Sequence, residues 1–168
     1  MNLAGTLPFG KCPLILKGSH MPHFGLMDEE SLGPEEGPLQ RAKLHIRCGR
    51  RRLQQDKIAL GIVTLYDALV SALKWYVASP ERREKLPMHD RESLNDDKVI
   101  YSILRRSGKL DDSLDYDFFN ALVENALEHE MSDYDYTGFL KNFESVMTQL
   151  GVMPFDEKSL PPENPSTV

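Results

Sequence analysis

Apolar side chains recur at steps of three and four residues along most of the chain, which is the spacing of amphipathic α-helices. Five segments carry this pattern: residues 38–53, 56–78, 93–108, 113–130 and 135–150. The strict alternation that marks half-buried strands is nearly absent, and no internal repeat is evident. The pattern therefore predicts an all-α fold, an antiparallel bundle of four to five helices.

The segment 56–78 is apolar around most of its circumference. Its polar edge is narrow and consists of Thr64, Asp67, Ser71 and Lys74. A helix with so wide an apolar arc is packed on more than one side, so this segment is predicted to be the central helix. The four polar residues also interrupt the run of about 20 apolar residues that a bilayer crossing needs, so we expect no membrane association.

Several residues mark where the helices should begin and end. Asp56 is placed to cap the second helix, and Ser93 followed by Asp96 resembles a capping box at the start of the third. Gly108 and Gly151 follow the last apolar residues of the third and fifth helices, where glycine commonly ends a helix.

Both ends of the chain lack a periodic apolar face. Residues 22–38 contain three prolines and three glycines among acidic side chains, and the stretch after Phe155 is rich in proline. We predict a disordered leader over residues 1–37, a helical bundle domain over residues 38–155 and a disordered tail over residues 156–168. Both ends should then be dispensable for stability.

The leader contains Gly18-Ser19-His20-Met21, which matches the residues that expression vectors leave before an inserted gene. Lys17-Gly18 can equally be encoded by a purine-rich stretch that resembles a bacterial ribosome-binding site. Both explanations predict that the true start is Met21, and the second also predicts a bacterial source. The alternative is that residues 1–20 form an ordinary native tail.

Composition narrows the classes of function. The chain has 168 residues, a net charge of −6 and only two cysteines, Cys12 and Cys48. An acidic balance gives no general attraction to nucleic acid or anionic lipid. The cysteines have no histidines at zinc-ligand spacing, so we expect a cytoplasmic protein without a disulfide framework, metal or cofactor. No phosphate loop, nucleophile elbow or kinase motif is present, so the sequence offers no recognisable catalysis.

A cationic cluster on the first helix is the main candidate for binding. It includes Arg47, Arg50, Arg51 and Arg52, whose forked donors suit phosphate or carboxylate ligands. From Asp111 to Asp135 the chain has nine carboxylates and no Lys or Arg. The arginines are therefore predicted to pair with these acids, within the monomer or across a homodimer, in preference to binding nucleic acid.

His129 is the second candidate, because it continues the apolar line of the fourth helix beside Glu128, Glu130 and Asp133. A metal centre in a helical bundle would need a carboxylate at position 126, where the chain has Ala126, so no metal site is predicted. We interpret His129 as a histidine of the core or of an interface. Cys48 is likewise interpreted as a structural cysteine, although its cationic surroundings could lower its pKa.

Two segments resemble the HEPN superfamily of helical bundles. Residues 41–77 resemble its opening helices, with a polar helix followed by an alanine-containing helix that ends in Leu73-Lys74. Residues 124–130 resemble the motif of its ribonuclease members, in which Arg and then a polar residue stand four to six residues ahead of His. The resemblance puts Asn125 and His129 on this motif, but Glu124 occupies the place of the arginine. A carboxylate there would repel the phosphate, so the resemblance implies a member without nuclease activity.

These observations together predict a non-catalytic, HEPN-like binding or assembly module. It should form a homodimer and bind a protein or nucleotide partner, with nucleic acid possible at Arg47, Arg50, Arg51 and Arg52 but not favoured. The alternative is a divergent HEPN-type ribonuclease that uses His129 and Asn125.

Overall fold

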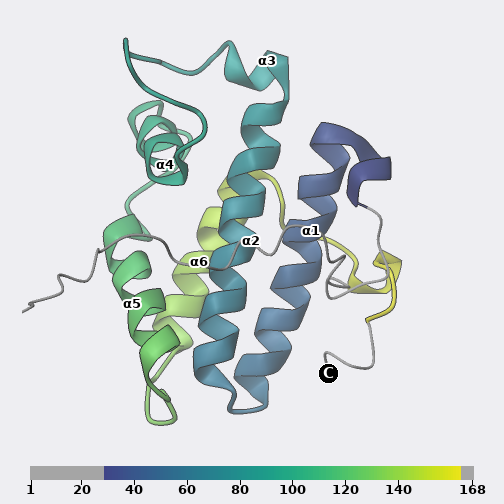
Figure 1. The fold of residues 1–168 in the computed structure, drawn as a ribbon, viewed down its shortest axis with the longest axis vertical. Helices are drawn as coiled ribbons and strands as arrows, with labels where there is room; N and C mark the ends of the chain where they lie inside the picture. Colours follow the sequence, from purple (N-terminus) through teal and green to yellow (C-terminus); the bar gives the residue numbers. More distant parts are fainter. Residues whose placement is uncertain (1–28, 164–168) are drawn as a thin grey trace, which may run out of the picture.

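Residues 29–163 are the part of the chain that the computed structural model describes, and they contain helices and no strand (Figure 1). The α-helices are α1 (Glu29–Gln54), α2 (Ile58–Ala78), α3 (Pro80–Arg83), α4 (Asp97–Arg106), α5 (Tyr116–Glu128) and α6 (Thr137–Leu150). A 3-10 turn, η1 (Glu157–Ser159), follows them. The predicted all-α fold is confirmed, and the unpredicted helix α3 is one turn long. The predicted start at Met21 lies outside the described residues.

Helix α2 is the central element of the bundle. It contacts each of the other five α-helices and crosses the middle of the molecule, with α1 on one side and α5 on the other (Figure 1). By length and composition α2 could also span a membrane. However, 56% of its most apolar window is buried within the protein, and the core helix of a soluble protein meets the same test. The wide apolar arc thus marks the central helix, as predicted.

Helices α1 and α2 form an antiparallel hairpin whose backbones approach closely at two glycines. A Cβ atom added to Gly49 would lie 2.6 Å from Leu65 Cδ2, and one added to Gly61 would lie 2.6 Å from Leu53 Cδ2. Leu53 and Leu65 are fully buried. Each glycine therefore makes room for a leucine of the other helix. This packing of two leucines against two glycines, which we call the interlock, fixes which face of α1 points away from α2.

The helix starts differ in part from the predicted ones. Asp56 does not cap α2, because it adopts a left-handed conformation (φ 59°) in the tight turn between α1 and α2. Ser93 does not cap α4. Asp96 does so, accepting hydrogen bonds from two backbone N–H groups of the first turn, and Asp115 caps α5 by accepting one, from the N–H of Phe118. Gly151 ends α6 in the left-handed conformation, as expected.

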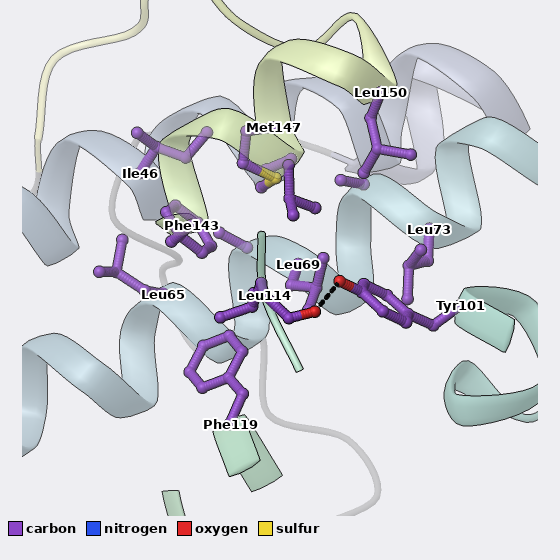
Figure 2. Close-up of a cluster of buried hydrophobic side chains, with 14 of the residues drawn as sticks. Ile46, Leu65, Leu69, Leu73, Tyr101, Leu114, Phe119, Phe143, Met147 and Leu150 are labelled. Atoms are coloured by element: carbon purple, nitrogen blue, oxygen red, sulfur yellow. Dashed lines mark hydrogen bonds between the residues drawn. The ribbon is translucent and has the colours of Figure 1, made fainter. Parts of the chain in front are cut away.

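The core lies where α2 meets α1, α4, α5 and α6 (Figure 2). Phe119 of α5 packs edge-on against Phe139 of α6 with their ring centroids 4.8 Å apart, and Phe143 completes the aromatic group. Tyr101 donates a hydrogen bond of 2.7 Å to the carbonyl oxygen of Leu114, which fixes the loop between α4 and α5. Burial raises the pKa of Tyr101 to about 12, so its hydroxyl stays protonated and keeps this bond at neutral pH.

Order extends beyond both predicted boundaries of the bundle. Residues 29–37 are helical, and the break expected from their glycines and prolines is confined to Gly33, whose φ of 83° kinks α1. Pro34 then stands in the first turn of the continuing helix, where proline is tolerated. In the predicted tail, Leu160 is 8% exposed and η1 is formed. The C-terminal segment, yellow in Figure 1, lies beside α1.

Candidate binding cleft on α1

Arg47, Arg50 and Arg51 lie on the side of α1 that faces away from the interlock with α2, since their spacing of three and four places them on one face. With side chains of α6 and the C-terminal segment they line a cleft of about 600 Å³, which we call the arginine cleft. Its lining consists of Arg47, Arg50, Arg51, Leu53, Gln54, Tyr136, Leu140, Glu144, Glu157 and Glu163. It combines guanidinium groups with apolar and aromatic walls.

Arg47 holds the main chain of the C-terminal segment. Its Nη2 donates a hydrogen bond of 2.7 Å to the carbonyl oxygen of Pro161, and its Nη1 donates one of 3.5 Å to that of Glu157. Its Nε lies 3.0 Å from a carboxylate oxygen of Glu163. Burial lowers the pKa of Arg47, although the charge of Glu157 opposes that shift. One guanidinium thus contacts both the backbone and a carboxylate of an extended segment.

Arg50 and Arg51 bind carboxylates. Arg50 Nε donates a hydrogen bond of 2.7 Å to Glu144 of α6, and its Nη1 lies 3.3 Å from Glu157. Arg51 forms an ion pair with Glu163. The charges of the three arginines are therefore balanced by three glutamates, two of which come from the segment after α6.

Arg52, the fourth arginine of the predicted cluster, does not line the cleft. Its Nη1 donates a hydrogen bond of 2.7 Å to the hydroxyl oxygen of Thr64, so it joins α1 to α2. Cys48 is fully buried, and Arg51 Nη2 lies 3.5 Å from its sulfur. Burial raises the pKa of the Cys48 thiol in spite of the nearby arginines, which agrees with a structural role.

The acidic stretch 111–135 does not supply the partners of the three cleft arginines. Among the described residues, Asp112 pairs with Arg105, and Asp117 lies 2.7 Å from Lys98. Intramolecular pairing of this stretch with the first helix was therefore a wrong prediction. The physical reason is the helix order, because α5 lies on the far side of α2 from α1 (Figure 1).

His129 and Asn125 lie at the C-terminal end of α5, and both are exposed. The backbone N–H of His129 donates to the carbonyl oxygen of Asn125 at 3.0 Å, while Glu124 accepts a hydrogen bond from Asn120. His129 is not a core histidine of the monomer, since the apolar line of α5 ends one turn earlier at Ala126, and its alternative place at an interface stays a prediction. Within residues 29–163 no group of three His, Cys, Asp or Glu side chains is placed to hold a metal ion.

The carboxylates that fill the cleft were missed because they are remote in sequence and stand in a proline-rich stretch. Glu157, Leu160 and Glu163 nevertheless carry a signal, since they are spaced by three residues. That spacing places side chains on one face of a 3-10 or polyproline II segment.

Comparison with known proteins brings no relative to light: no family model, curated protein or solved structure matches the chain. The resemblance to HEPN proteins stays a prediction.

Proposed function

We propose that this chain is a non-catalytic helical binding module of the cytoplasm, whose arginine cleft holds an anionic segment of a protein partner. The observation that carries the proposal is that an acidic segment of the chain itself forms one wall of the cleft and pairs with its arginines. A site that accepts such a segment from its own chain has the shape and charge to accept one from a partner.

The contacts favour a protein ligand over nucleic acid. Arg47 donates two hydrogen bonds to main-chain carbonyl oxygens. A peptide offers such oxygens along its whole length, and a phosphate backbone does not. Glu144, which Arg50 holds in the cleft, and the net charge of −6 repel carboxylates and phosphates alike, so the preference for a protein ligand rests on the main-chain contacts of Arg47.

We also propose that the module self-associates. Phe118 and Leu127 of α5 and Leu60 of α2 are 54%, 69% and 53% exposed, which is unusual for large apolar side chains. A homodimer that covers some of them should persist in high salt, because apolar contacts are not screened. Sedimentation that shows only monomer at high micromolar concentration in both low and high salt would contradict this part of the proposal.

Fluorescence anisotropy tests the binding site on the full chain. The probes are a labelled glutamate-rich peptide and a single-stranded RNA oligonucleotide of equal charge. We expect the peptide to bind, more weakly as salt rises, and the RNA to bind at least tenfold more weakly. Arg50→Glu should abolish peptide binding, and Arg83→Glu on exposed α3 should leave it unchanged. If neither probe binds the full chain or its variant Glu157→Gln with Glu163→Gln, the proposal is wrong; if RNA binds more tightly than the peptide, the partner class is wrong.

Arg83 serves as the control in preference to its neighbour Arg82. Arg82 stacks over the ring of Trp75 at 4.3 Å and donates hydrogen bonds to the carbonyl oxygens of Trp75 and Tyr76. It therefore closes the C-terminal end of α2, and its reversal would disturb the fold.

A divergent ribonuclease is the second candidate. The exposure of His129 and Asn125, one helical turn apart at the end of α5, is the observation that favours it. The exposed carboxylates of Glu124, Glu128 and Glu130 oppose it, because they would repel RNA. Cleavage of RNA by the purified chain that disappears in His129→Ala with helicity unchanged would establish this candidate and overturn the non-catalytic one.

A further inference from the structure

Three side chains of the C-terminal segment point to a pattern that the arginine cleft recognises. Glu157, Leu160 and Glu163 are spaced by three, and the backbone between them is first 3-10 helix and then, at Leu160, extended with φ −77° and ψ 152°. Both conformations have three residues per turn. The three side chains therefore share one face, and they are the ones that are buried or paired with arginines.

We infer that the arginine cleft is a receptor for an extended segment with the pattern Glu-x-x-Leu-x-x-Glu in a partner protein. Residues 157–163 of the chain imitate that segment and compete with it for the site. The inference rests on the proposed function and adds to it the identity of the ligand and a means of control.

The positive charge of the arginines favours binding of an acidic ligand when the C-terminal segment leaves the cleft. With Glu157 and Glu163 in place, three arginines face three glutamates. Without them, the described lining of the cleft has three arginines and one glutamate, Glu144, which is a net charge of +2 (3 − 1). A segment with two carboxylates at the same separation restores neutrality.

The C-terminal segment is bound weakly enough to be exchanged for a segment of a partner protein. The ion pair of Arg50 with Glu157 is 27% and 48% exposed on its two sides, and ion pairs so exposed contribute little net free energy. The pairs of Glu163 with Arg47 and Arg51 are less exposed, so Glu163 is the more firmly held of the two carboxylates. Leu160 is the buried apolar anchor of the segment. Attachment through the short link after α6 raises the effective concentration of the segment to the order of millimolar, so a free ligand faces strong competition.

The competition can be measured on the full chain. Glu157→Gln with Glu163→Gln removes the two carboxylate charges that pair with the cleft arginines and keeps the shape of both side chains. The ligand is a labelled peptide with the sequence of residues 156–168, DEKSLPPENPSTV. We expect the double variant to bind this peptide at least tenfold more tightly than the unmodified chain does, because the competing segment has been weakened.

Two matched peptides test the pattern itself. DEKSLPPNEPSTV has the same composition and charge but shifts the second glutamate by one residue, and DEKSAPPENPSTV lacks the leucine. Each should bind the double variant at least fivefold more weakly than the original peptide. Arg51→Gln added to the double variant should reduce this difference for the shifted peptide, since Arg51 pairs with Glu163 together with Arg47.

The results separate this inference from the proposed function. Equal affinity of the unmodified chain and the double variant would overturn the competition, and equal affinity of the original and shifted peptides would overturn the pattern; either would leave a general anion-binding cleft standing. No binding of any acidic peptide would overturn both. The single variant Glu163→Gln, with circular dichroism to confirm the fold, repeats the test if the double variant is unstable, and the same outcomes decide it.

Discussion

The two faces of α1 are held by different physical means. On the inner face, Gly49 and Gly61 let α1 and α2 approach until the fully buried side chains of Leu53 and Leu65 pack against them. On the outer face, ion pairs of arginines with glutamates hold the C-terminal segment over a cleft of about 600 Å³. The inner face is suited to a permanent contact between two helices, and the outer face is suited to a ligand that can be exchanged.

This difference has an energetic basis. Burial of apolar side chains contributes about 25 cal/mol per Å² and is insensitive to salt, so the inner face should carry most of the stability. Ion pairs at a partly exposed surface contribute little net free energy of folding. They do contribute specificity, because they form only between groups of opposite charge in a suitable geometry. The outer face should therefore carry specificity and contribute little to stability.

Leu53→Ala, on the inner face, should have the largest effect on stability. Leu53 is fully buried against Gly61, so truncation leaves a cavity where the two helices meet. Truncations of this kind cost about 2–5 kcal/mol. Urea unfolding followed by circular dichroism measures the change. A cost below about 1 kcal/mol would show that the joint is loosely packed.

Gly61→Ala should have the next largest effect, about 1–3 kcal/mol, because its Cβ would meet Leu53 at 2.6 Å. Gly138→Ala in α6 is the matched control, since nothing lies within 4 Å of the added Cβ. Helix propensity should make that change neutral or stabilising by up to about 1 kcal/mol. Combined with Leu53→Ala, Gly61→Ala should cost less than it does alone, because the smaller side chain leaves room for the methyl group.

Leu160→Ala should have a moderate effect, about 1–2 kcal/mol, because Leu160 is 8% exposed in the C-terminal segment. In a chain of this size that corresponds to a fall of about 4 °C in melting temperature. Leu127→Ala, at a leucine that is 69% exposed, is the matched control and should change little. The apolar pattern alone predicts that residues 38–155 keep the full melting temperature; if they do, Leu160 contributes nothing.

Arg50→Gln should have the smallest effect on stability, below about 1 kcal/mol, since its partners Glu144 and Glu157 are partly exposed. The effect should shrink further at 1 M salt, where the Debye length falls to about 3 Å. Melting curves at low and high salt, with Arg83→Gln for comparison, measure it. A loss of more than about 2 kcal/mol in the free energy of unfolding that salt leaves unchanged would mean that the outer face also stabilises the fold.

The periodic parts of the fold were predictable from the sequence. The central role of α2, its end at Ala78 and the end of α6 at Leu150 follow from apolar spacing and from glycine at position 151. Caps were less predictable, because serine and aspartate residues cluster near the helix starts. Ser93 and Asp96 both suit the start of α4, and only the backbone geometry of Asp96 brings its carboxylate to the N–H groups.

Only the arginines of the site were predictable from the sequence, and their partners were not. The spacing of Arg47, Arg50 and Arg51 indicates a shared cationic face, but their partners depend on which helices are neighbours. The acidic stretch 111–135 has more carboxylates, yet Glu157 and Glu163 are closer in space. The order of helices around α2 is a property of the whole chain, so no local pattern of charge reveals it.

Whether the C-terminal segment occupies the arginine cleft is the central claim, and backbone order parameters from nuclear magnetic resonance test it most directly. The backbone amides of Glu157, Ser159, Leu160 and Glu163 report on the segment. We predict values of about 0.8, close to those of α6, in the full chain, and a fall below about 0.6 at Glu163 in the double variant Glu157→Gln with Glu163→Gln. Values below about 0.6 at all four amides of the unmodified chain would contradict the account, because the segment would then move freely in solution.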